Sequence, residues 1–90
     1  MQHLITKFIM RIKLVLCGGM EYSSHNKLLV YIDEEQCKLV SDLVSYLTRI
    51  YNLPPIYLTI DDYYLSAESI LTHAIKEDEV IHAHLIQPLS

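Results

Sequence analysis

Two clusters of carboxylates are the first residues in this sequence that could carry out chemistry. Asp61 and Asp62 are adjacent, and Glu77, Asp78 and Glu79 follow one another. Paired carboxylates can serve as general acid and general base when apolar surroundings raise the pKa of one of them. Both clusters fall in predicted turns that are open to solvent, so the sequence favours structural turns over a catalytic pair.

The histidines and one cysteine offer two other kinds of site. His82 and His84 are two residues apart, which on a strand places both imidazoles on one face. Zinc would need a third ligand, such as His25 or His73, and a better-specified set than this one. Cys37 precedes the best predicted helix, where a thiol can become a nucleophile, but no histidine follows at an offset that suits a base. The sequence therefore predicts partner-facing histidines, a half-buried structural cysteine, and no metal or other cofactor.

Two further observations argue against an enzyme or a conjugated modifier. Gly18 and Gly19 are followed by neither a lysine nor a helix, so they do not form a phosphate-binding loop. The sequence ends in IQPLS and lacks the terminal diglycine that conjugation needs. Cys17 and Cys37, without a secretory signal, are expected to be reduced thiols in an intracellular protein, because small disulfide-bonded domains usually carry more pairs.

The composition indicates one small folded domain. The chain has 90 residues, of which 51% are hydrophobic and 20% charged, and the charged share is below the roughly 25% that is usual. Some apolar surface should therefore remain for a partner to cover. The apolar segment LITKFIMRIKLVL at residues 4–16 contains three bases, so it predicts a strand and no membrane contact.

Charge is distributed unevenly along the chain, whose net charge is −4. Lys7, Arg11 and Lys13 are the charged residues of the first thirteen positions, whereas the rest of the chain holds four bases and all eleven acids. A nucleic-acid surface needs a basic face with few acids nearby, so no direct nucleic-acid binding is expected. The layout favours contact between the basic part of one copy and the acidic part of another.

The spacing of apolar residues predicts the elements that position these side chains. Strands are expected at 10–16, 27–33, 56–60, 63–65 and 80–86, a long helix at 39–51 and a short helical turn at 66–70. Asp61 and Asp62 form the hairpin turn, Asn52 ends the long helix, and its cap lies at either Lys38 or Ser41. One apolar face of each long strand can meet the helical stripe Leu39, Val40, Leu43, Val44, Leu47, Ile50 and Tyr51.

This order of elements predicts an α+β fold, the ubiquitin-like β-grasp roll. In that fold a mixed sheet wraps over one main helix, and the first and last strands lie side by side at its centre. We expect the domain at residues 10–87, preceded by an extension at residues 1–9 that can lengthen the first strand and followed by a tail at residues 88–90.

Three segments also resemble a known family. LLVYIDEEQCKLVSDLVSYL, then IYLTIDDYYLSAESI, and finally DEVIHAHL are similar to the amino-terminal domain of coilin, the scaffold protein of nuclear Cajal bodies, over roughly residues 10–86. The acidic approach DEEQC is longer than is usual in that family. The resemblance implies a self-associating ubiquitin-like domain in the nucleus, with itself and other nuclear-body proteins as partners.

The outward faces of the strands and the acidic turns together form the predicted interface. Basic and aromatic groups on the sheet would meet carboxylates of a neighbouring copy, head to tail. An alternative is a monomeric recognition domain that binds a distinct partner through its sheet face. The predicted interface residues are Arg11, Lys13, Leu29, Tyr31, Tyr57, Asp61, Asp62, Glu77, Asp78, Glu79, His82 and His84.

Overall fold

The computed structural model describes residues 9–86. The predicted tail lies outside these residues, and so does the predicted extension apart from Ile9, which begins the first strand. Five strands and two helices follow along the chain: β1 (Ile9–Leu16), β2 (Lys27–Asp33), α1 (Val40–Tyr51), β3 (Ile56–Ile60), β4 (Tyr63–Tyr64), α2 (Leu71–Ala74) and β5 (Val80–Leu85).

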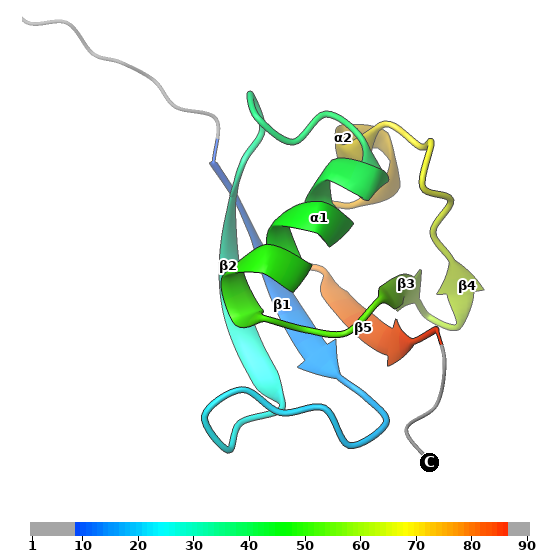
Figure 1. The fold of residues 1–90 in the computed structure, drawn as a ribbon. Coiled ribbons are helices and arrows are strands. Elements are labelled where there is room, and N and C mark those ends of the chain that lie inside the picture. Colours follow the sequence, from blue (N-terminus) through cyan, green and yellow to red (C-terminus); the bar gives the residue numbers. More distant parts are fainter. Residues whose placement is uncertain (1–8, 87–90) are drawn as a thin grey trace, which may run out of the picture.

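The strands form one mixed sheet in the order β2-β1-β5-β3-β4, with α1 lying across one of its faces (Figure 1). β1 and β5 run parallel at the centre, and the other neighbouring pairs are antiparallel. The chain therefore has the α+β, β-grasp architecture that the order of elements predicted, with the first and last strands side by side.

The predicted core faces of the four long strands are confirmed. Alternate residues of each strand are buried under the helix, because successive side chains of a strand point to opposite faces. The buried strand residues are Met10, Ile12, Leu14, Leu16, Val30, Ile32, Ile56, Leu58, Ile81 and Ala83, with Leu28, Ile60 and Leu85 partly buried at the margins.

Helix α1 buries Val40, Leu43 and Leu47, as its spacing predicted. The expectation that Ile50 belongs to the core is wrong, since its residue remains 48% exposed. With 100° between successive residues, Ile50 lies at the border of the stripe, whereas Tyr51 lies nearer its centre and is half-buried. In the part of the chain that the structure describes, no helix is long and apolar enough to cross a membrane.

The start of α1 is capped in a way that the sequence did not indicate. Neither Lys38 nor Ser41 is the cap residue; Leu39 is, and the backbone N–H groups of Lys38 and Leu39 both donate to Asp42 Oδ2 at 3.0 and 2.9 Å. The predicted end is confirmed, because Asn52 adopts the left-handed conformation with φ 53° and donates its N–H to Thr48.

The helical turn expected at residues 66–70 is wrong. This segment runs as turns and a bridge, and the short helix α2 begins only at Leu71. The N–H groups of Val40 and Ser41 donate to the carbonyls of Ser69 and Ala67, both at 2.9 Å. The segment thus supplies acceptors for the first N–H groups of α1, which have no partner within their own helix.

Candidate functional site

The face of the sheet turned away from α1 carries most of the residues of interest. Cross-strand pairing aligns Arg11 with Tyr31, Lys13 with Leu29, and Tyr57 with His84 on this outer face. Leu29 and Tyr31 are 50% and 55% exposed on this face, beside Lys13 and Arg11. Each of these residues lies on the face that the alternation of strand residues predicted.

Arg11 forms an ion pair within the molecule. Its Nε and Nη2 atoms donate to the two carboxylate oxygens of Asp78 at 2.5 and 2.9 Å. The Arg11 N–H also donates to the carboxylate of Glu77, and the Asp78 N–H donates to the Arg11 carbonyl. The hydrogen bond and charge of Asp78 hold the pKa of Arg11 above its ordinary value, and the same hydrogen bond lowers the pKa of Asp78.

This pairing corrects one expectation about the acidic residues. The segment Glu77 to Glu79 is not an acidic pole separate from the basic strand, because it lies beside β1 in the same molecule. Lys13 completes the connection by donating its N–H to the Glu79 carbonyl at 2.9 Å. The turn before β5 is therefore tied to the first strand, and Asp78 is already occupied by Arg11.

A cluster of rings covers the other half of the outer face, over β3, β4 and β5. Tyr57 stacks on His84 with ring centroids 4.9 Å apart and lies 5.9 Å from Tyr64, while His82 lies 6.3 Å from His84. Thr59 is 9% exposed beneath this cluster, and its Oγ1 atom forms a 2.8 Å hydrogen bond with Nε2 of His84. His84 thus has a structural role in addition to its place on the predicted interface.

The hairpin between β3 and β4 projects acids and aromatic rings from one edge of the sheet. Asp61 and Asp62 have φ angles of 49° and 69°, the conformation of a two-residue hairpin turn, which aspartate tolerates. The next two residues are the most exposed aromatics described, with Tyr63 at 77% and Tyr64 at 64%. The hairpin turn that the sequence predicted is confirmed.

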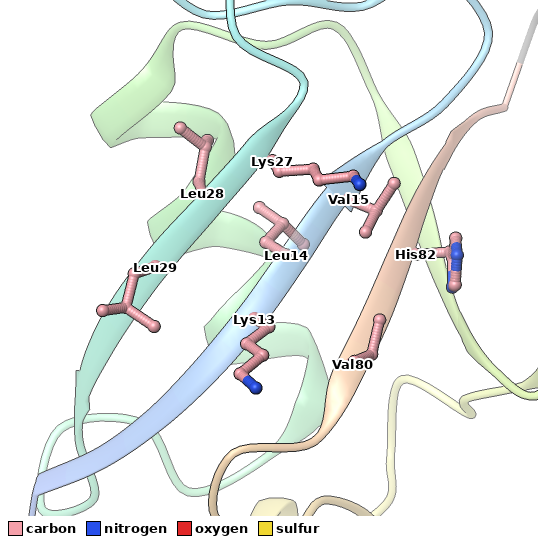
Figure 2. A pocket seen from close by; sticks show the side chains of 8 residues that line it. All are labelled: Lys13, Leu14, Val15, Lys27, Leu28, Leu29, Val80 and His82. Atoms are coloured by element: carbon pink, nitrogen blue, oxygen red, sulfur yellow. The ribbon is translucent and has the colours of Figure 1, made fainter.

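A shallow groove lies on the outer face over β1, between β2 and β5 (Figure 2). The side chains that line it on this face combine two amines with aliphatic groups and one imidazole, and Val15 and His82 among them are only partly exposed: Lys13, Val15, Lys27, Leu29, Val80 and His82. The cross-strand partners Lys13–Leu29, Val15–Lys27 and Lys13–Val80 place these groups next to one another. Such a groove suits a ligand that is apolar and negatively charged.

The two cysteines are free thiols, and neither has the environment of a nucleophile. Burial, followed by the nearby carboxylates of Asp42 and Asp33, raises the pKa of Cys37, and burial also raises the pKa of Cys17. Raised values favour the unreactive protonated thiol. Among residues 9–86, no three histidine, cysteine or acidic side chains lie close enough together to hold a metal ion.

Some residues of the outer face were missed by sequence reasoning. Lys27, Val80, Val15 and Tyr64 line the groove or the ring cluster but were not in the predicted interface. Lys27 and Val80 stand at the first positions of their strands, and alternation with the buried residues Val30 and Ile81 was the signal that could have placed them outward.

Solved structures share this fold. A structure described as molecular mimicry of SUMO that promotes DNA repair aligns with a TM-score of 0.65 and 15% identity, over 92% of this chain and 98% of that chain. A ubiquitin from Caldiarchaeum subterraneum aligns with a TM-score of 0.63 and 18% identity, over 83% of this chain and 90% of the other. The ubiquitin-like domain of an Arabidopsis thaliana protein aligns with a TM-score of 0.65 and 18% identity, over 94% and 84% of the two chains.

These likenesses show the fold of the chain. It is the ubiquitin-like β-grasp fold, as the order of elements predicted. No family model and no curated protein matches its sequence.

Proposed function

We propose that the chain is a non-catalytic protein-interaction domain that associates with other copies of itself. The observation that carries this proposal is the separation of opposite charges across the sheet. Lys13 and Lys27 lie on β1 and β2, whereas Asp61 and Asp62 lie in the β3–β4 turn at the far edge. Charges held apart by a rigid sheet can pair between molecules more readily than within one.

The structure changes which residues this proposal uses. Arg11 and Asp78 satisfy each other inside the molecule, so we assign the basic side of the contact to Lys13 and Lys27. The acidic side remains with Asp61 and Asp62. Arg11→Glu would then act mainly on the connection between β1 and the turn before β5, and is a poorer probe of association than a change at Lys27.

The resemblance to the coilin amino-terminal domain supports a finer proposal. We infer that the domain is the assembling part of a nuclear-body scaffold, located in Cajal bodies, with other nuclear-body proteins as additional partners. A tagged copy expressed in human cells tests this: it should concentrate in Cajal bodies, and a variant that no longer self-associates should spread through the nucleoplasm. Uniform distribution of the parent domain would contradict the nuclear-body assignment.

A second candidate function is recognition of a different protein by a monomeric domain. The exposed Leu29 and Tyr31 and the stacked ring of Tyr57 favour it, because aromatic and aliphatic side chains on a sheet suit a heterologous partner equally well. This second function does not require the carboxylates of Asp61 and Asp62 in the β3–β4 turn.

Sedimentation velocity over a concentration series from micromolar to millimolar, at low salt, separates the two functions. Self-association predicts that the weight-average mass rises with concentration beyond that of a single chain. A mass that stays at 10.5 kDa throughout would contradict self-association and leave the monomeric recognition domain.

A further inference from the structure

The groove over β1 has an apolar floor and two amines that, in the part of the chain that the structure describes, have no acid within ion-pair distance. Leu29 is half exposed, Val80 is 43% exposed, and both flank Lys13 through cross-strand pairing. In residues 9–86 the ion pair of Arg11 with Asp78 is the only one, so Lys13 and Lys27 have no acid within ion-pair distance. The charge of Lys13 is among the causes that lower the pKa of Asp78, so Lys13 already acts on an acid of its own molecule.

The tip of the β3–β4 hairpin has the complementary chemistry. Asp61 and Asp62 place two carboxylates at the turn, and the largely exposed ring of Tyr63 stands directly beside them. The turn conformation is set by backbone geometry and by pairing of Thr59 and Ile60 with the two tyrosines of β4. A tip that is already ordered loses little conformational entropy on binding.

The sheet order separates Lys27 of the groove from the hairpin tip of the same molecule. The groove lies over β2, β1 and β5, and the tip follows β3 near the edge formed by β4 (Figure 1). Lys27 is on β2 and Asp61 directly follows β3, and the strands β1 and β5 lie between β2 and β3 in the sheet. The tip is therefore better placed to meet Lys27 of another molecule than Lys27 of its own. A contact between two different patches of identical chains leaves one free tip and one free groove at every stage, so it produces rings or open chains.

We propose that the β3–β4 hairpin tip of one copy docks into the β1 groove of the next. The carboxylates of Asp61 and Asp62 pair with Lys27 and Lys13, and the Tyr63 ring packs on Leu29 and Val80. Tyrosine suits this place because it buries a large apolar ring and keeps a polar hydroxyl. This inference rests on the proposed self-association and specifies the contact between the hairpin tip of one copy and the groove of the next, which we call the joint.

Two variants, each damaged at one side of the joint, test it by complementation. The groove variant carries Lys27→Glu and Leu29→Ser, two exposed positions of the edge strand β2 that leave Lys13 and Asp78 untouched. The tip variant carries Asp61→Asn, Asp62→Asn and Tyr63→Ser, and asparagine tolerates the left-handed turn as aspartate does. Circular dichroism should show the parent fold in both.

Each variant alone should be monomeric at concentrations at which the parent associates, with association weakened about tenfold or more. An equimolar mixture should form a dimer and nothing larger, because one intact tip meets one intact groove and the other two surfaces are disabled. Glu34→Gln with Glu35→Gln removes two acids from the loop after β2 and should leave association unchanged.

The outcomes distinguish the joint from self-association in general. If the parent associates and both variants do the same, the joint is wrong while the proposed function stands. If the parent is monomeric throughout, the groove belongs to another protein, and both the joint and the proposed function fail. Should a variant fail to fold, adding unlabelled parent to labelled parent replaces the test: amide signals of residues 61–64 and of 13, 27, 29 and 80 must shift together, and shifts confined to other surfaces would overturn the joint.

Discussion

Arg11 and Asp78 form the clearest contact between distant parts of the chain. The carboxylate of Asp78 accepts from two guanidinium nitrogens, a bidentate geometry that adds orientation to the attraction of charges. Asp78 also takes the left-handed conformation, with φ 63°, which aspartate tolerates better than most residues. The same residue therefore shapes the turn before β5 and ties that turn to β1.

Asp78→Asn should lower the thermal midpoint at neutral pH, because asparagine keeps the turn but loses the charge. The hydrogen bond from Arg11 lowers the pKa of Asp78 in the folded protein, so its contribution to stability is present above the pKa of the unfolded aspartate, about 4, and is lost as pH falls through the lower folded value. The difference in midpoint between parent and variant should therefore be full at neutral pH and shrink in strong acid.

Asp61→Asn is the matched control for this prediction. Asp61 also has a left-handed turn conformation, but it lies in the hairpin tip without a basic partner within ion-pair distance in the described residues. Its midpoint should follow that of the parent at every pH. A variant at Asp78 that is as stable as the parent at neutral pH would show that the ion pair adds nothing to stability.

Thr59→Val probes the polar contact beneath the ring cluster. The substitution keeps the shape of the side chain but removes the hydroxyl that bonds His84, and a hydrogen bond of this kind contributes about 0.5–1.5 kcal/mol. Urea unfolding should show a loss of that size, whereas Thr72→Val on the exposed side of α2 should change little. If the two substitutions lower the free energy of unfolding equally, the hydrogen bond between Thr59 and His84 does not contribute to stability.

At the scale of elements, helix α1 is stabilised by its buried apolar stripe and by hydrogen bonds at both of its ends. Its stripe packs on the sheet, its first N–H groups donate to the segment before α2, and Asn52 closes its last turn. Segments far apart in sequence thus complete the helix, which is too short to be stable alone.

Leu47→Ala should destabilise the fold by about 2–5 kcal/mol, because it removes buried methyl groups from the centre of the stripe. That is a large part of the stability of a small domain. Ile50→Ala, three residues further along the same helix but exposed, should cost within about 0.5 kcal/mol. Chemical unfolding of both variants checks the pair, and similar losses would mean that the helix is rotated from the orientation described.

At the scale of the whole molecule, the sheet separates the groove from the hairpin tip. The central pair β1 and β5 is buried on the helix side. Lys27 and Leu29 lie to one side of this pair, on β2, and Asp61, Asp62 and Tyr63 lie to the other side, in the β3–β4 hairpin. The proposed contact between identical domains would use these two separate surfaces.

Salt should weaken self-association, because exposed charges are screened beyond about 10 Å at 0.1 M ionic strength. Light scattering at low salt and at about half-molar salt should therefore report a smaller mean mass in the second condition, with unchanged circular dichroism. Association driven by apolar contact alone would persist or strengthen. If the mean mass is the same at both salt concentrations, the lysine–aspartate pairs do not hold the copies together.

The sequence by itself determined the elements and their faces. Alternation of apolar residues placed β1, β2, β3 and β5 and decided which residues are buried, since a strand has a fixed period of two. Turn chemistry placed Asp61 and Asp62, and the left-handed preference of asparagine ended α1 at Asn52. All of these rules act over a few residues, so no tertiary information was needed, and the order of elements then indicated the β-grasp fold.

Only the tertiary structure decided which outward residues meet. Arg11 and Asp78 are 67 residues apart, and they pair because the parallel register of β1 with β5 sets Lys13 opposite Val80. The same register sets Val80 of β5 beside the groove, and Ile70, which was expected to end a helical turn, instead forms a bridge with Leu39. Such contacts depend on how whole strands align, a choice made by packing over the entire core and not by any local pattern of residues.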